Sequence, residues 1–349
     1  MKILVLGGTG AMGAHLIKIL AENGHDVFVT TRKVREDSRN ITYLTGDAHA
    51  NVFLEKLLEK HWDVIVDFMI YSTPEFHRRV GLLLRAAGQY VYLSSSRVYA
   101  DSASPITEDS PRLLDVCRDP VYLATDEYAL AKARQEDLLK NSGNRNWTVI
   151  RPYITYSETR LQLGVLEKES WLYRALHGRT IVFSKDIAPN TTTLTYGFDV
   201  ARGIASILGV QGALGEVFHI THSEYHTWSE ILSVYLDVLE KHFGKQPPVL
   251  IMDSFPDLKS GKYQLIYDRR FNRRFDNTKI GGFIDTSTFK PPLTGLKECL
   301  ADFLEKPRFN LLPCRIEARA DKLAGERTQL CELSDWKRRI KYLICRYCM

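Results

Sequence analysis

The stretch KILVLGGTGAMG (residues 2–13) decides the fold. Lys2–Leu6 is an apolar run of strand length, and the glycines that follow it form a turn. From Ala14 onward the apolar residues return at helical spacing. Strand, glycine turn and helix in this order are typical of dinucleotide binding. The turn lets the backbone approach a pyrophosphate, and the helix N-terminus offers it N–H groups.

The end of the second strand bears on which dinucleotide is bound. An NAD site usually ends this strand with Asp or Glu for the ribose 2′-OH. This chain has Thr30 and Thr31 there, followed by Arg32 and Lys33. No carboxylate repels a 2′-phosphate, and the forked guanidinium of Arg32 suits one. We therefore expect NADP(H), with NAD(H) as the alternative, although the two cations could also be a solvated loop pair.

Tyr128 and Lys132 form the pattern Y-x-x-x-K, which places both side chains on one face of a helix. A lysine ammonium favours the phenolate, so a tyrosine beside it can exchange a proton with a carbonyl or alcohol. Upstream, the apolar run of residues 90–93 leads into Ser94-Ser95-Ser96. A hydroxyl at the carboxyl end of a parallel strand faces the crevice where such sheets bind ligands. Taken singly, each pattern is also common on ordinary helix surfaces and in turns.

Together these features resemble the extended short-chain dehydrogenase/reductase family, which contains nucleotide-sugar epimerases, dehydratases and reductases. The resemblance spans roughly residues 1 to 305. Its markers are the glycine turn, Gly46-Asp47, SSSRVY (residues 94–99), PITED (105–109), Tyr128 with Lys132, RPY (151–153), TYGFDVA (195–201) and GEVFHI (215–220). They are specific to the family but not to one activity.

The resemblance implies a role for each matching residue. Tyr128 would be the general acid/base, Ser95 the hydroxyl that polarises the substrate oxygen, and Lys132 the group that binds the nicotinamide ribose and tunes Tyr128. The residues expected to contact the cofactor are Gly7, Gly10, Ala11, Met12, Gly13, Arg32, Asp47, Pro152 and Tyr153. Asp47 would approach the adenine, and Pro152 and Tyr153 the nicotinamide.

Two positions depart from the dehydratases of the family. Those enzymes follow the catalytic Thr with Asp-Glu, the acid and base that remove water, whereas this chain has Ser96-Arg97. The resemblance therefore argues against dehydration, and we assign Ser96 and Arg97 to substrate contact. Arg269, in the arginine-rich stretch of residues 267–276, is the candidate for the diphosphate of a nucleotide sugar.

The alternation of short apolar strands and helical segments over residues 1–155 predicts an α/β fold, a doubly wound parallel sheet of the Rossmann type. We expect a smaller mixed substrate lobe over residues 156–305, interleaved with the last core elements, and a basic C-terminal tail over 306–349. Thr227 with Glu230 predicts a capped helix start, and residues 180–183 predict a strand.

The composition and the distribution of charge indicate which kinds of binding partner to expect. The net charge is +5 over 349 residues, and residues 311–349 hold nine Lys or Arg against five acids. The body is therefore near neutral, and we expect no nucleic-acid surface.

The helix expected over residues 336–347 could lie on an anionic membrane, contact a partner, or dock on its own domain. The six cysteines lack framework spacing, no segment reads as a signal peptide, and the histidines lack companion ligands. We expect a cytoplasmic protein without a metal. The family resemblance implies a homodimer.

Three functions remain open. The first is an NADP(H)-dependent reductase of a keto-sugar nucleotide. The second is a nucleotide-sugar epimerase that keeps NAD tightly bound and uses the same residues. The third is a non-catalytic dinucleotide-binding scaffold, against which the presence of Ser95, Tyr128 and Lys132 argues.

Overall fold

The structure is a computed structural model that describes residues 1–254 and 261–348. The chain divides into two compact units. The first comprises residues 1–155, 193–224 and 273–290, and the second comprises residues 156–192, 225–272 and 291–349. Residues 306–349, expected as a separate tail, group with the second unit. The lobe expected over 156–305 gives two of its stretches to the first unit.

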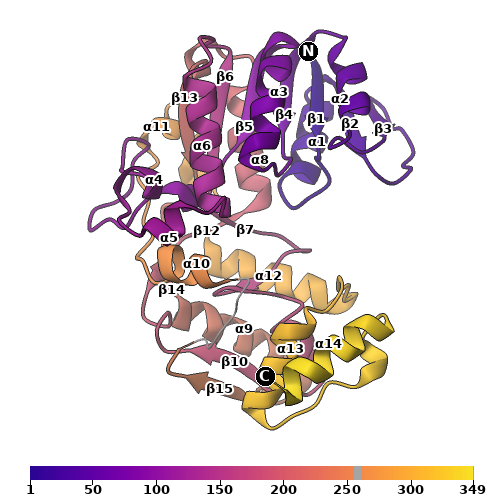
Figure 1. Cartoon of the computed structure of the whole chain (residues 1–349), viewed down its shortest axis with the longest axis vertical. Helices are drawn as coiled ribbons and strands as arrows, with labels where there is room; N and C mark the ends of the chain where they lie inside the picture. Colours follow the sequence, from indigo (N-terminus) through magenta and orange to yellow (C-terminus); the bar gives the residue numbers. More distant parts are fainter. Residues whose placement is uncertain (255–260, 349) are drawn as a thin grey trace. The chain divides into compact units, whose positions relative to one another are not determined.

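A seven-stranded parallel sheet forms the centre of the first unit (Figure 1). Its strand order is β13-β6-β5-β4-β1-β2-β3. The strands are β1 (Lys2–Leu6), β2 (Asp26–Thr31), β3 (Ile41–Thr45), β4 (Trp62–Asp67), β5 (Ala87–Leu93), β6 (Trp147–Pro152) and β13 (Glu216–Ile220). The register pairs Val5 with Val29 and with Val66, and Leu93 with Ile150. The prediction of a doubly wound Rossmann-type sheet is confirmed.

Helices cover both faces of this sheet because its strands are apolar on both sides. Ile3 and Val5 of β1 pack under α1 and α8, whereas Leu4 and Leu6 pack under α2, α3 and α6. The helices of this unit are α1 (Gly13–Glu22), α2 (Asn51–Leu58), α3 (Thr73–Arg85), α4 (Leu113–Val116), α5 (Pro120–Leu123), α6 (Tyr128–Lys140), α8 (Gly197–Ile207) and α11 (Thr278–Gly281). The 3-10 turns are η1 (Ser96–Val98), η2 (Gln211–Ala213) and η4 (Thr286–Thr288), and β12 (Leu194–Tyr196) pairs with β7 (Ile154–Tyr156).

The second unit combines short strand pairs with helices. Its strands are β8 (Gln162–Leu163), β9 (Leu166–Glu167), β10 (Ile181–Ser184), β11 (Thr191–Thr192), β14 (His226–Thr227) and β15 (Val249–Met252). Its helices are α7 (Leu172–Leu176), α9 (Trp228–Phe243), α10 (Lys262–Gln264), the π-type turn η3 (Leu265–Arg269), α12 (Pro292–Glu305), α13 (Cys314–Ala324), the 3-10 turn η5 (Leu330–Glu332) and α14 (Trp336–Tyr347). The expected capping box is present: Glu230 N donates to Thr227 Oγ1, and Thr227 N donates to Glu230 Oε2.

A buried ionic cluster holds α13 in the second unit. The fully buried Arg174 guanidinium of α7 donates to Glu317 and Asp321 of α13 at 3.1 and 2.8 Å, and to Glu326 at 2.8 Å. One cation faces three carboxylates, so the cluster favours keeping a proton on one of them. Burial raises the pKa of Glu317 to about 7, with Arg174 opposing and Asp321 reinforcing the shift. Glu317 Oε1 has no hydrogen-bond partner.

Within the described residues, no helix has the length and apolarity that crossing a lipid bilayer requires.

The protonation of Glu317 predicts a pH dependence of stability. Between the ordinary pKa of 4.5 and about 7, the folded state holds a proton that the unfolded chain has released. The free energy of unfolding should therefore fall as pH rises through this window, by roughly 1–3 kcal/mol. Urea unfolding at several pH values would measure it. Glu317→Gln stays neutral throughout and should lose this part of the slope, and an identical slope in both proteins would contradict the assignment.

Candidate functional site

The residues expected to carry the chemistry gather at one edge of the sheet. The seven strands are parallel, so their carboxyl ends meet at the same edge. The glycine turn follows β1, Thr31 ends β2, Asp67 ends β4, and the serine cluster follows β5. Helix α6 begins at Tyr128 and covers the face beside β5. The first unit therefore supplies the whole candidate site described below, apart from Arg269.

The glycine turn has the geometry of a pyrophosphate cradle. Gly7 adopts φ +70°, and a Cβ on Gly13 would lie 2.5 Å from Gly8 O, so helix α1 can approach the turn only with glycine there. A Cβ on Gly10 would meet nothing within 4 Å, which leaves open space beside the turn. Helix α1 starts after Met12 without a side-chain cap or an acid in its first turn. These features fit a bound anion at the helix N-terminus.

The expected tyrosine and lysine lie one turn apart at the start of α6. Tyr128 is the first residue of the helix and is half-buried, and Lys132 is 2% exposed. The Lys132 ammonium lies 5.9 Å from the centre of the Tyr128 ring and 4.5 Å from that of Tyr92. It donates to Leu93 O at 2.7 Å. The ammonium is thereby held between the end of β5 and the phenol ring.

The environment of Lys132 is unusual for a lysine. Burial lowers the pKa of Lys132 to about 8, and the nearby carboxylates of Asp67 and Glu136 oppose the shift. Asp67 accepts hydrogen bonds from the hydroxyls of Tyr90 and Tyr71 at 2.8 and 3.0 Å, and burial raises its pKa. A lysine with a lowered pKa can hold or release a proton near neutral pH.

Glu136 completes this polar interior. It is fully buried and pairs with the Arg151 guanidinium at 2.6 and 2.9 Å, while the Ser94 hydroxyl donates to the same carboxylate. Burial alone would raise the pKa of Glu136, but Arg151 and the hydrogen bonds outweigh it and the pKa is lowered. Asp67 and Glu136 were not among the residues expected at the site. The available signals were an acid closing the apolar strand β4 and an acid four residues after Lys132 on the same helix face.

The three serines after β5 have different placements. Ser95 is 7% exposed and caps the turn η1, accepting from Arg97 N at 3.2 Å. Ser94 is bound to Glu136. Ser96 was expected to contact substrate, but it is fully buried and its hydroxyl donates to Arg151 O at 2.7 Å. Ser96 therefore joins the turn to β6. Its contact with a substrate stays a prediction.

Arg97, expected at the substrate, lies against Tyr128. The carbon at the centre of its guanidinium is 5.3 Å from the centre of the Tyr128 ring. Its Nη2 donates to Glu127 Oε1 at 2.7 Å. Glu127 in turn caps α6, with its Oε2 accepting from Ala129 N and from the Tyr122 hydroxyl. The phenol ring thus has a second cation beside it, fixed by a carboxylate that also starts the helix.

The other residues expected to contact the cofactor lie at the same edge of the sheet, and their side chains differ in exposure. Pro152 ends β6, and Tyr153 is buried with its ring 5.2 Å from that of Phe275. Asp47 is exposed and accepts from His49 N at 3.0 Å. Arg32 is exposed directly after β2. The contacts of these residues with a cofactor stay predictions.

Arg269 belongs to the interior of the second unit. It is 2% exposed, its Nε donates to Gly164 O at 3.0 Å, and its guanidinium pairs with Asp268. The arginine-rich stretch of residues 267–276 predicts a contact between Arg269 and a substrate diphosphate, and that contact stays a prediction. The contacts present make it a link between loops of its own unit, because burial and pairing with an acid already engage its charge.

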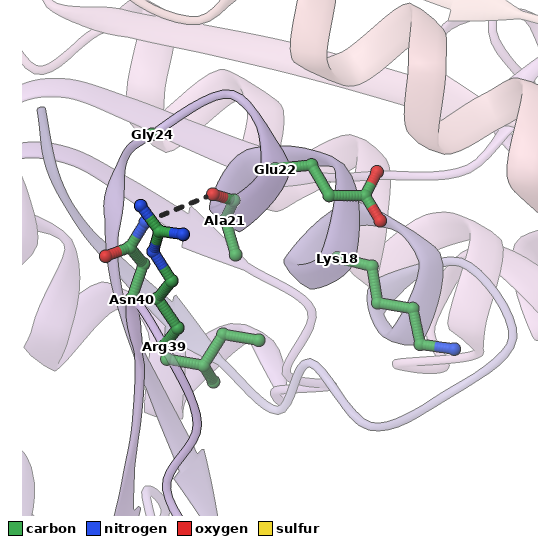
Figure 2. A pocket seen from close by; sticks show the side chains of 7 residues that line it. Lys18, Ala21, Glu22, Gly24, Arg39 and Asn40 are labelled. Carbon is green, nitrogen blue, oxygen red and sulfur yellow. Dashed lines mark hydrogen bonds between the residues drawn. The ribbon is translucent and has the colours of Figure 1, made fainter.

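A separate open pocket of about 430 Å³ lies at the opposite edge of the sheet, where strands begin (Figure 2). It is lined by the end of α1 and the start of β3, and Asn40 donates to Ala21 O within it. It lies far along the strands from the glycine turn and contains none of the expected site residues. Among the described residues, no group of three or more His, Cys, Asp or Glu could hold a metal ion.

Known proteins are similar to this chain in sequence or in fold. The chloroplast stem-loop binding protein of 41 kDa b from Arabidopsis thaliana is 26% identical over 302 residues, covering 78% of this chain and 76% of the relative. Two solved structures align with 88% of this chain and their whole length. They are the Bordetella bronchiseptica enzyme WbmH in complex with NAD+ (16% identity, TM-score 0.67) and the UDP-glucuronic acid 4-epimerase from Bacillus cereus in complex with UDP-glucuronic acid and NAD (20% identity, TM-score 0.66).

The sequence itself matches the model of one family over most of the first unit. The NAD dependent epimerase/dehydratase family matches residues 3–220, more than half of the chain. This range runs from the first strand of the sheet to the end of β13 and includes the glycine turn, Ser95, Tyr128 and Lys132. The resemblance inferred from the motifs is confirmed. The chain belongs to the NAD dependent epimerase/dehydratase family.

Proposed function

We propose that this protein is an NADP(H)-dependent oxidoreductase that reduces a keto group of a nucleotide-activated sugar. The observation that carries the proposal is the buried Lys132 ammonium, held by Leu93 O beside the Tyr128 ring at the ligand-binding edge of the sheet. A buried cation beside a half-buried phenol favours the phenolate that remains after proton donation. The nucleotide-sugar substrate is suggested by the family and by the Bacillus cereus epimerase, which binds UDP-glucuronic acid.

Each residue has a defined task in this reduction. A bound nicotinamide supplies a hydride to the carbonyl carbon of the substrate. Tyr128 donates its phenolic proton to the carbonyl oxygen, and Ser95 donates a hydrogen bond to the same oxygen. Lys132 stabilises the phenolate that results. Gly7, Gly10 and Gly13, with the N-terminus of α1 after Ala11 and Met12, would hold the pyrophosphate.

Arg97 is best placed as a positioning residue for Tyr128. Its guanidinium and the Lys132 ammonium both lie within 6 Å of the phenol ring centre. Glu127 anchors Arg97 at 2.7 Å, which limits its reach toward a substrate. A cation over an aromatic face contributes electrostatically, and a charge beside a phenolate favours the ionised form. Arg97 therefore supports the same proton transfer as Lys132.

The cofactor assignment depends on the end of β2. Gly7 N donates to Thr30 Oγ1 at 3.0 Å, which ties the glycine turn to the end of β2. Thr30 and Thr31 stand at this strand end, where an NAD site usually has an acid. The exposed Arg32 follows directly and supplies a cation for a 2′-phosphate.

The alternative is an epimerase that retains NAD, favoured by the NAD in both structural neighbours. Mass spectrometry of the isolated protein distinguishes them, because stoichiometric NAD without added cofactor favours the epimerase.

A second alternative is a dinucleotide-binding scaffold without turnover. The Arabidopsis thaliana relative is named for binding a stem-loop rather than for sugar chemistry. Ser95, Tyr128 and Lys132 argue for catalysis, because a scaffold has no use for a buried ammonium beside a phenol. A cytoplasmic homodimer that contacts no nucleic acid completes the proposal, and sedimentation equilibrium tests its oligomeric state.

Tyr128→Phe should slow reduction strongly while leaving cofactor binding intact. With NADPH and a panel of 4-keto-6-deoxy sugar nucleotides, kcat should fall by about 10²- to 10⁴-fold, because only the proton donor is lost. The absorbance of reduced nicotinamide measures turnover, and its fluorescence measures binding. A wild-type trace that stays flat across the panel would refute the reductase. A cellular role that survives Tyr128→Phe would favour the scaffold.

Arg97→Met should shift the pH dependence of the reaction. Without the second cation the phenolate is less favoured, so the pH of half-maximal kcat/KM on the basic limb, where Tyr128 loses the proton that it must donate, should rise. Arg97→Lys should restore part of the shift, and Glu127→Gln, which keeps the cation but weakens its anchor, should give a smaller one. A large rise in KM with an unchanged pH profile would instead assign Arg97 to substrate binding.

Arg32→Ser should separate the two dinucleotides. Loss of a charge-assisted contact with a 2′-phosphate should raise the KM for NADPH by roughly tenfold or more and leave that for NADH unchanged. Arg39→Ser is the matched control, because Arg39 is an exposed cation at the opposite edge of the sheet. Equal KM values for both cofactors in the wild-type protein would reject the NADP(H) preference.

A further inference from the structure

Helix α14 exposes an apolar stripe. Trp336, Ile340, Ile344 and Tyr347 are between 48% and 64% exposed. They recur at intervals of four, four and three residues, which places them on one face of a helix. Isolated exposed apolar residues are ordinary, whereas a continuous stripe along three turns of one helix marks a surface that binds something.

The opposite face of α14 is docked on the second unit. Tyr342 is fully buried, and its hydroxyl donates to Asp321 at 2.6 Å. Arg338 donates to Leu312 O at 2.8 Å, and Arg346 donates to Glu326 O at 3.1 Å. Figure 1 shows α14 beside α13, near the C-terminus. These contacts fix the rotation of the helix about its axis, so the apolar stripe is a stable outward face.

Cations border the stripe on both sides. At 100° per residue, Arg339 lies along one border and Lys337 with Lys341 along the other, and all three are exposed. The helix contains five Lys or Arg and no acid between Trp336 and Tyr347. Asp335 stands before the first turn, where it caps the helix by accepting from Arg338 N at 3.0 Å. The exposed face of α14 therefore carries only positive charge.

We propose that this face of α14 docks the protein on an anionic lipid surface. An apolar stripe that carries tryptophan and tyrosine and is flanked by Lys and Arg is the pattern of a helix lying in the plane of a membrane interface. The apolar side chains enter the acyl boundary while the cations meet the headgroups.

Other occupants fit this face less well. A second copy of α14 would bring cations against cations, with no acid on the exposed face to pair them. Four side chains on one helix are also few for a stable protein interface, which uses about 20–30 residues a side. A lipid surface needs neither shape complementarity nor a matched set of acids, and it accepts both the stripe and its basic borders.

Vesicle sedimentation with the whole protein tests the proposal. Vesicles of phosphatidylcholine and phosphatidylserine should bind it, and pure phosphatidylcholine vesicles should bind it much less. Trp336→Ser with Ile340→Ser should weaken binding by at least about tenfold, because it halves the stripe. Lys337→Glu with Lys341→Glu should weaken it by more than about 25-fold, at roughly fivefold for each cation lost. Added salt should reduce binding of the wild type.

The matched control lies on α2 in the first unit. Val52→Ser with Lys56→Glu removes an exposed apolar residue and an exposed cation one helical turn apart, and should bind vesicles like the wild type. Circular dichroism confirms the fold of each variant. Equal binding by the α14 and α2 variants, or no vesicle binding at all, would overturn the proposal. Self-association lost with Trp336→Ser would assign the face to a second copy, and variant-sensitive binding of poly-glutamate without vesicle binding would assign it to an acidic polypeptide.

Discussion

The buried ammonium of Lys132 is the interaction on which the candidate site depends. It is bonded to Leu93 O, the last carbonyl of β5, and it lies one helical turn from Tyr128. The Lys132 ammonium thus connects strand β5, helix α6 and the Tyr128 phenol. A lone ammonium in the interior would cost several kcal/mol, which is why such a group needs nearby acids and hydrogen-bond acceptors. Asp67 and Glu136 supply the negative charge that keeps it there.

The same requirement explains the polar layer between α6 and the sheet. Glu136 supports Lys132 but is itself a buried charge, and Arg151 of β6 neutralises it in a two-point pair. Gln135 links the Tyr92 hydroxyl to Tyr71 O, which extends the network to the segment after β4. Removing one member would leave another charge unpaired. The site is therefore held together by paired charges and hydrogen bonds as well as by apolar packing.

The buried polar layer between α6 and the sheet is also the part of the structure that the sequence predicted least well. The strands of the sheet and the glycine turn follow local rules of period and conformation, so Lys2–Leu6 and Gly7 were placed correctly. The capping box at Thr227 is likewise local. The burial of Ser96 and Arg269 and their partners within the chain could not be foreseen, because sequence does not tell whether a polar side chain turns outward or pairs inside. Glu136 was missed because α6 buries charges on the face where a pattern search expects apolar residues.

The end of β2 connects the structure of the glycine turn with the proposed cofactor preference. Thr30 accepts from Gly7 N, and this bond ties the turn to the end of β2. A carboxylate at this position could accept the same bond, but it would place a negative charge beside the adenosine ribose. The Thr30 hydroxyl accepts the hydrogen bond from Gly7 N without adding a negative charge. The exposed Arg32 can then act on a 2′-phosphate without a competing internal acid at that strand end. The proposed preference for NADP(H) thus depends on the side chain that holds the turn as well as on the cation that follows it.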